Sequence, residues 1–200
     1  IVDDAAVCEA AKQEIIRRYF AALDSVVKGT GSNNEIYKLE LLMKQAGISE
    51  VSRKSVVAAR ELSEATGEPA AAIELNDGAV VKGKTSNLLG CASAMLLNAL
   101  KHLAGLDDEI LLITPEVIIP VQELKTNHLG NKNPRLHTDE VLIALSISAV
   151  HDKNAARAME QLCNLKNCEM HTSVLLSPID ENIMKKLGIR LTCDPKKQNK

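Results

Sequence analysis

The chain has 200 residues, which suffices for an α/β domain with a helical appendage and a sizeable core. Hydrophobic residues make up 46% and charged residues 25%, the composition of a soluble globular protein. A formal net charge of -2 offers no basic field for a nucleic-acid duplex or an anionic membrane, and an aromatic content of 2% disfavours the stacking platforms of single-strand binders. We therefore expect neither nucleic acid nor a membrane among the partners.

The five cysteines are odd in number and scattered through apolar or helical contexts. This pattern indicates reduced thiols, and we expect a cytoplasmic protein. No run approaches the roughly 18 uninterrupted apolar residues of a transmembrane helix, and no signal peptide is present. Because the sequence opens on Ile1 without an initiator methionine and enters a helical pattern at once, we also expect a piece of a longer protein.

The first third of the chain shows helical periodicity. Three helices are predicted, over residues 3–28, 32–46 and 49–66, and each is followed by a glycine. These helices predict a helical subdomain over residues 1–66, with the boundary between Gly67 and Pro69.

After this boundary the period changes to that of strands. Residues 72–75 and 79–81 flank the turn Asn76-Asp77-Gly78 and predict a β-hairpin. A long helix over residues 86–104 follows. The apolar run at residues 109–114 is typical of a strand buried on both faces.

Helices and strands continue to alternate toward the C-terminus. Pro115 suits the first turn of the next helix, and another helix begins at His137 or Thr138. Strand, helix and strand in alternation indicate an α/β subdomain over residues 67–195, and residues 196–200 read as a flexible tail. The remaining predicted elements are helices over residues 154–165 and 178–187 and strands over residues 169–177 and 189–193.

Residues 78–85, GAVVKGKT, match the Walker A expression G-x-x-x-x-G-K-S/T. A working phosphate loop needs a flexible nest of amides between its glycines, whereas here strand formers separate them and Gly78 belongs to the hairpin turn. We therefore favour the hairpin. What remains is a predicted helix start at Lys84, Thr85, Ser86 and Asn87, where free amides and the helix dipole favour an anion; Ser86 as an ordinary N-cap is the alternative.

The densest group of polar side chains lies in residues 127–140, NHLGNKNPRLHTDE, between two predicted helices. Acids at the start of a helix are routine partners of its dipole, and Thr138 and Asp139 could simply cap the helix. Arg135 and His137 gain nothing at that end of a helix unless they face an anion. We therefore predict that this segment binds a ligand or takes part in catalysis.

Two patterns partly match known metal sites. A zinc deaminase would pair His137 and Asp139 with Cys163 and Cys168, but the acid is not Glu, four residues rather than two separate the cysteines, and no proline precedes them. Residues 171–180 show part of a metalloprotease pattern without its second histidine. We predict no metal site from these patterns.

Several segments closely resemble one bacterial family: GKTSNLLGCASAMLLNALKHLAG, ITPEVIIPVQELK, HLGNKNPRLHTDEVLIALSISA, CEMHTSVLLS and LGIRLTCDP. The chain resembles the C-terminal part of uncharacterised protein family 0371, or domain of unknown function 1846, and the resemblance is specific from Gly83 onward. It implies that an N-terminal half with a glycine-rich, phosphate-loop-like segment is absent. It also implies a three-layer αβα subdomain, similar to the cytidine-deaminase topology, with a helical subdomain packed on it. Residues 83–87 and 131–140 are implied as family hallmarks.

We expect the substrate-binding half of a cytosolic enzyme that acts on an anionic small molecule, for example a nucleotide-like one, with the absent N-terminal half completing the cleft. His137, Asp139 and Glu140 are the candidate catalytic residues, in which either acid would orient His137 or bind a metal ion. The alternative is a structural module that forms a homo-oligomer and has no catalytic activity. The sequence identifies no cofactor. The candidate ligand-binding residues are Lys84, Thr85, Ser86, Asn87, Asn131, Asn133 and Arg135.

Overall fold

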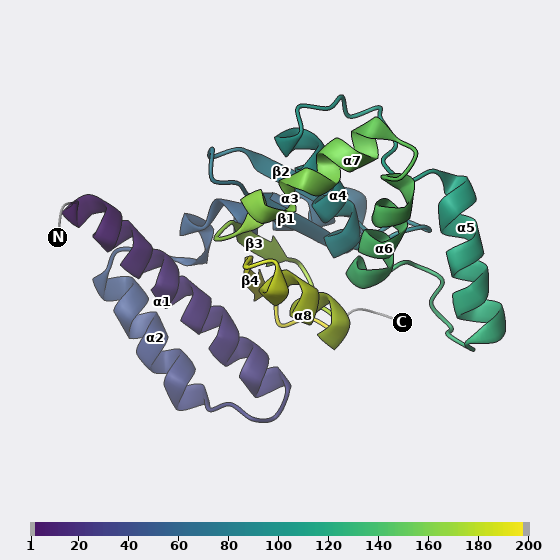
Figure 1. Cartoon of the computed structure of the whole chain (residues 1–200). Helices are drawn as coiled ribbons and strands as arrows, with labels where there is room; N and C mark the ends of the chain where they lie inside the picture. The colour runs from purple at the N-terminus through teal and green to yellow at the C-terminus, as the bar shows by residue number, and fades with distance from the viewer. Residues whose placement is uncertain (1–2, 198–200) are drawn as a thin grey trace.

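The computed structural model describes residues 3–197. Its N-terminal part consists of two long helices, α1 (Asp4–Val27) and α2 (Asn33–Gln45), which lie side by side (Figure 1). The carboxylate of Asp3 caps α1 by accepting a hydrogen bond from the amide of Ala6 at 2.9 Å. Both predicted helices are confirmed. The two helices share a small core that includes Ile16, Phe20, Leu39 and Met43.

A short 3-10 helix (Glu50–Ser52) leads into α3 (Lys54–Thr66), which packs on the sheet. Ala58 and Ala59 of α3 form a buried cluster with Ala72 of the sheet. Val56 of the same helix joins the core of α1 and α2. The third predicted helix thus connects the N-terminal helices to the sheet, and the predicted division of the chain after residue 66 stays a prediction.

The chain has a mixed α/β fold built on a four-stranded sheet with the order β2-β1-β3-β4. The strand β1 runs antiparallel to β2 and β3, whereas β3 and β4 are parallel. The predicted hairpin between β1 and β2 is confirmed, and the predicted strand at residues 169–177 ends already at Thr172. The strands are β1 (Ala70–Glu74), β2 (Val80–Lys84), β3 (Glu169–Thr172) and β4 (Arg190–Cys193).

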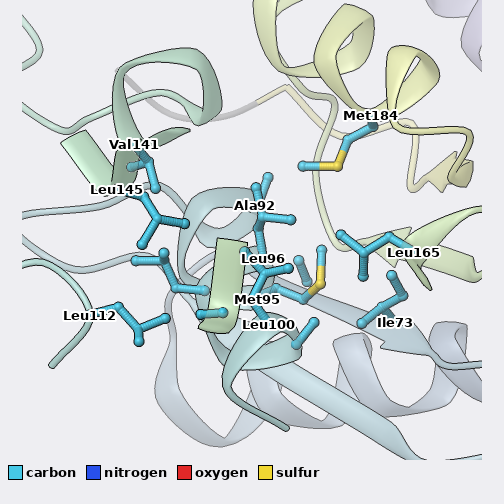
Figure 2. Close-up of a cluster of buried hydrophobic side chains, with 14 of the residues drawn as sticks. Ile73, Ala92, Met95, Leu96, Leu100, Leu112, Val141, Leu145, Leu165 and Met184 are labelled. Carbon is cyan, nitrogen blue, oxygen red and sulfur yellow. The ribbon is translucent and has the colours of Figure 1, made fainter. Parts of the chain in front are cut away.

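Helices cover both faces of the sheet. Neighbouring residues of β1 point to opposite faces, and Ile73 packs into the main core whereas Ala72 packs against α3. The main core lies around α4 (Cys91–Leu103), and Figure 2 shows its side chains. It also includes residues of α6 (Thr138–Ser148), α7 (Lys153–Glu160), the 3-10 helix Gln161–Leu165 and α8 (Pro178–Lys186).

The predicted strand at residues 109–114 is wrong, because these residues form no strand in the described structure. Leu112 and Ile113 are nevertheless buried, and Leu112 joins the same core cluster as Leu145 (Figure 2). Leu111, which directly precedes them, is 61% exposed. The apolar run therefore fills the core from an irregular segment, which satisfies the same hydrophobic pattern as a buried strand.

The predicted start of the long helix is also wrong, because α4 begins at Cys91 and not near Ser86. Residues 86–89 form a turn in which the Ser86 hydroxyl accepts hydrogen bonds from the amides of Leu88 and Leu89, each at 3.2 Å. Leu89 then forms an isolated parallel β-bridge with Leu136. This pairing across the chain holds the turn out of the helix.

Farther along, α5 (Pro115–Glu123) begins with Pro115 as predicted and continues into a π-helix (Leu124–His128). Part of the predicted tail is tied down, since the Lys196 carbonyl accepts a hydrogen bond from the Leu175 amide at 2.8 Å. Residues 198–200 of that prediction lie outside the described residues.

All five cysteines are free, in agreement with the predicted reduced thiols. Cys8 and Cys163 are exposed, whereas the other three thiols are buried. Among the helices of residues 3–197, none has the length and apolar character needed to cross a membrane.

Candidate functional site

His137 occupies the residue immediately before α6, and its backbone is held from two directions. Its amide donates a hydrogen bond to Oε2 of Glu140 at 2.7 Å. The same oxygen accepts a hydrogen bond from Nζ of Lys125 at 2.7 Å, and this ammonium also donates to the Arg135 carbonyl at 2.7 Å. Lys125 is buried in the π-helix, a type of turn that often occurs at functional sites. The Lys125–Glu140 pair therefore fixes the backbone that presents His137.

The imidazole of His137 is held by Asp180 of α8, 43 positions later in the chain. Nδ1 of His137 lies 2.9 Å from Oδ2 of Asp180. The same oxygen accepts a hydrogen bond from the Ser177 hydroxyl at 2.7 Å, while Oδ1 accepts two from the amide and hydroxyl of Thr138, each at 2.9 Å. One nearly buried carboxylate thus collects four hydrogen bonds and joins the start of α6 to the start of α8.

These contacts stabilise an ion pair. Hydrogen bonding to Asp180 raises the pKa of His137 above its ordinary value, although partial burial opposes this. Burial alone would raise the pKa of Asp180, but the hydrogen bonds from His137, Thr138 and Ser177 outweigh it and lower that pKa. Asp180 is therefore ionised and His137 readily protonated.

The geometry also determines which ring nitrogen of His137 is free. Because an ionised carboxylate only accepts hydrogen bonds, Nδ1 must carry the proton that faces Asp180. Nε2 has no hydrogen-bond partner within residues 3–197, and the side chain is 27% exposed. An imidazole held in this way can gain or lose a proton at Nε2 without moving.

Two of the segments with predicted ligand-binding residues, the turn at residues 86–89 and the segment before His137, lie next to each other. Nε of Arg135 donates to the Ser86 carbonyl at 2.8 Å, and the Leu136 amide donates to the Leu88 carbonyl at 2.9 Å. The Asn87 carbonyl accepts a hydrogen bond from Gln122 of α5 at 3.2 Å. The turn at residues 86–89 is therefore tied to the strand-like segment that precedes His137.

Lys84 and Thr85 do not join this arrangement. Gly83 faces α4, and because successive strand residues point to opposite faces, Lys84 faces the side of the sheet that α3 covers. The hydroxyl of Thr85 is buried without a hydrogen-bond partner in the described structure. The helix start predicted here is wrong, because α4 begins only at Cys91, and a role of these residues in binding an anion stays a prediction.

The other predicted polar residues hold the loop together. The side chain of Asn133 accepts a hydrogen bond from the Arg135 amide at 3.1 Å, and Asp139 accepts one from the amide of Glu140 at 2.9 Å. Asn131 is exposed. Of the two acids expected to orient His137, Glu140 holds its backbone, whereas its ring is held by Asp180 and by neither of them.

Asp180, Ser177 and Lys125 are the residues that the sequence analysis did not place at this site. Ser177 and Asp180 look like an ordinary helix cap, with the Asp180 amide donating to the Ser177 hydroxyl at 3.2 Å. Only the fold reveals that the same carboxylate reaches His137. Lys125 carries no local signal because it lies in a helical segment of mixed composition.

Two further features bear on possible ligands. Within residues 3–197, no group of three or more His, Cys, Asp or Glu side chains is arranged to hold a metal ion. An apolar cavity of about 190 Å³ lies beside Leu88 and Leu89, in the turn that binds Arg135, and Ile113 and Ile118 also line it.

Comparison with known sequences places the chain in a family. The model described as the C-terminal part of the domain of unknown function DUF1846 matches residues 51–200, and the N-terminal model of the same family matches residues 1–47. A UPF0371 protein of Corynebacterium glutamicum is 51% identical over 200 residues, which are 100% of this chain and 40% of the relative. The UPF0371 protein DIP2346 of Corynebacterium diphtheriae is 53% identical over 198 residues, 99% of this chain and 40% of the relative.

A more distant relative shows the same proportions. A UPF0371 protein of Streptococcus sanguinis is 49% identical over 195 residues, 98% of this chain and 40% of the relative. The chain thus spans about 40% of the length of the curated relatives it matches. The resemblance seen in the sequence is confirmed: the chain belongs to the DUF1846 (UPF0371) family, whose descriptions name no activity.

Proposed function

We propose that this chain carries the acid–base half of an enzyme active site, in which His137 exchanges a proton with an anionic small molecule through Nε2. The observation that carries the proposal is the contact between Nδ1 of His137 and the buried carboxylate of Asp180 at 2.9 Å. It fixes the ring, selects its tautomer and leaves one nitrogen free toward solvent. Neither the capping of α6 nor that of α8 requires an imidazole at this position.

The charge of this region favours an anion. His137 is protonated more readily than an ordinary histidine, because its hydrogen bond with Asp180 raises its pKa. The guanidinium of Arg135 uses Nε to bind the Ser86 carbonyl, and its two terminal nitrogens have no hydrogen-bond partner within residues 3–197. A guanidinium with two free nitrogens matches the paired oxygens of a carboxylate or phosphate.

The cavity beside Leu88 and Leu89 supports a ligand that also has an apolar part, such as the base of a nucleotide. In this proposal the N-terminal region of the longer family members closes the cleft from the side of His137. We further propose that the protein acts in the cytosol and that the α/β part has a three-layer arrangement with cytidine-deaminase-like topology. Helices on both faces of the sheet support the latter.

A structural module is the second candidate, and one observation favours it. Most polar groups of the loop are engaged with backbone, as Lys125, Asn133 and Glu140 each bind a main-chain group of residues 135–137. Such contacts stabilise a loop without any ligand. The free Nε2 of His137 separates the two candidates, because a purely structural loop gives this atom no task.

The test uses a full-length family protein that contains this sequence. Thermal unfolding is followed with a panel of nucleotides, nucleosides and phosphorylated metabolites for the parent, His137→Asn and Arg135→Ala. Asparagine can still donate a hydrogen bond to Asp180, so His137→Asn keeps the local geometry while removing the titratable nitrogen. His151→Asn, at an exposed position, is the matched control.

We expect at least one anionic compound to raise the melting temperature of the parent and of the His151 variant. The same compound should have little effect on the other two variants. Equal ligand-induced shifts in all four proteins would exclude a binding role for His137 and Arg135. Ligand-free melting temperatures show separately how much each residue contributes to stability.

A further inference from the structure

The N-terminal helix α2 presents an apolar outer side that nothing in the described chain covers. Its inner side, with Leu39 and Met43, packs against α1. On the outer side Tyr37 is 61% exposed and Leu41 is 42% exposed, and Leu42 on the flank of the helix is 45% exposed. Tyr37 and Leu41 are one helical turn apart and therefore form a continuous apolar strip.

The first turns of α1 are similarly bare. Residues 3–11 are exposed throughout, although the segment reads DDAAVCEAA and contains only three acidic residues. Val7 in its middle is 50% exposed. A short helical end without tertiary contacts gains little stability from its own hydrogen bonds. A helix that continues for two apolar turns past its neighbour is typical of a helix that packs against a further domain or chain.

Figure 1 shows where this surface lies: α1 and α2 project from the α/β part of the molecule, and the start of α1 forms the outer end of the projection. Any polypeptide that precedes α1 in a longer protein enters at this end. It therefore arrives at the bare first turns of α1, and the exposed strip of α2 lies farther along the same projection, level with the later part of α1.

The family comparison indicates what covers this surface. The N-terminal family model matches residues 1–47, which contain α1 and α2, whereas the C-terminal model begins only at residue 51. The relatives are longer, since 200 matched residues make up 40% of the Corynebacterium glutamicum protein. The helix pair thus belongs in sequence to a domain most of which lies outside this chain.

We infer that the surface formed by Val7, Tyr37, Leu41 and Leu42 is the docking face for the N-terminal domain of the longer family protein, and that α1 and α2 are the last two helices of that domain. In this arrangement α1 joins two cores: its inner side packs on α2 and on β4, and its first turns pack on the preceding domain. The inference concerns domain assembly and does not depend on the chemistry of His137.

A site-specific photocrosslink in a full-length family protein tests this directly. The photoreactive residue p-benzoylphenylalanine replaces Tyr37 in one variant and Leu42 in another, and the crosslinked peptides are identified by mass spectrometry. Two positions are used so that a folding defect at one leaves the other informative. Leu41→Asp is then added to each, with Glu40→Gln on the same helix as its matched control.

The docking face predicts intramolecular crosslinks from both positions to residues that precede the present chain. Their yield should fall several-fold with Leu41→Asp and stay unchanged with Glu40→Gln. Crosslinks between two copies of the protein would overturn the inference in favour of a homo-oligomer. Products confined to the present chain, or no product from either position, would overturn it as well.

Discussion

Replacing Asp180 with asparagine removes the charge that holds His137 while keeping the size of the side chain. The remaining amide oxygen can still accept the two hydrogen bonds from Thr138. The new amide nitrogen takes the place of the oxygen that now lies 2.9 Å from His137 Nδ1 and 2.7 Å from the Ser177 hydroxyl. The carboxylate is lost and the packing is not, so the variant isolates the electrostatic part of the contact.

The size of the effect follows from the contacts. Hydrogen bonds to a charged group contribute about 1.5–3 kcal/mol each, and the variant weakens two of them. The new amide can donate to Ser177 and to a neutral His137, which recovers part of the loss. We expect the free energy of unfolding to fall by about 2–3 kcal/mol near pH 6.

The directions of the two pKa shifts determine how the stability difference between parent and variant changes with pH. The raised pKa of His137 means that its pairing stabilises the parent fully below the ordinary value of 6.5, and that this stabilisation is lost as the pH rises through the folded-state pKa. The lowered pKa of Asp180 adds stability that is present above 3.8 and is lost as the pH falls through its folded-state pKa. In Asp180→Asn the carboxylate that raises the pKa of His137 is missing while its partial burial remains, so this pKa should be lower than in the parent.

Urea unfolding of parent and variant at several pH values measures this difference, and NMR titration of the His137 ring follows its pKa. The gap in unfolding free energy should be widest below the ordinary histidine pKa of 6.5 and should narrow as the pH rises through the folded-state pKa of His137, which the titration locates. A gap that stays constant as the pH passes through that pKa, or a pKa of His137 that does not fall in the variant, would refute the proposed ion pair.

Three further predictions concern other parts of the fold. Gly83→Ala should destabilise by about 3 kcal/mol or prevent folding, because an added Cβ would lie 2.1 Å from a backbone nitrogen of α4; a loss below about 1 kcal/mol in urea unfolding would contradict this close approach. Lys125→Met should cost about 2–3 kcal/mol, because it leaves its partly buried carboxylate partner unpaired, and a double-mutant cycle with that partner should show coupling. In native protein, iodoacetamide should label Cys8 and Cys163 rapidly but not Cys91, whose burial raises its pKa to about 12; rapid labelling of all five thiols would show that the core is open.

Much of the fold could be predicted because local signals decide it. The turn at Asp77 and Gly78 allows few conformations other than a hairpin turn, and Gly78 has a φ of 86°. Pro115 and Pro178 each begin a helix, as their fixed φ and missing amide hydrogen favour. At these positions the local sequence and the tertiary structure require the same conformation.

The two wrong predictions of secondary structure share one cause, which is contact between distant parts of the chain. Leu89 fits the apolar stripe of α4, yet it bridges to Leu136 and leaves the helix. The run at residues 109–114 is apolar enough for a strand, but it contributes core side chains from an irregular segment. Periodicity records that a residue is buried and cannot record which neighbour buries it.

The candidate site shows the same division. His137 was identified from its place before a helix, where a cation is unfavourable without an anionic partner. The partner is Asp180 of α8, whose local pattern indicates only a helix cap. Lys84 is predicted to bind the same ligand as His137 because it is expected at a helix start. In the structure it lies in β2, and it faces the side of the sheet that α3 covers. Local chemistry thus indicated the histidine, and the fold was needed to find its carboxylate.

The central claim is that His137 is an oriented acid–base group that meets an anion. The most direct measurement is the NMR titration of its two ring nitrogens in a full-length family protein, with and without the compound that most raises its melting temperature. We expect Nδ1 to stay protonated throughout, Nε2 alone to titrate, and the anion to raise the pKa of the ring. A pKa that is the same with and without the compound, or a proton on Nε2 with Nδ1 bare, would contradict this claim.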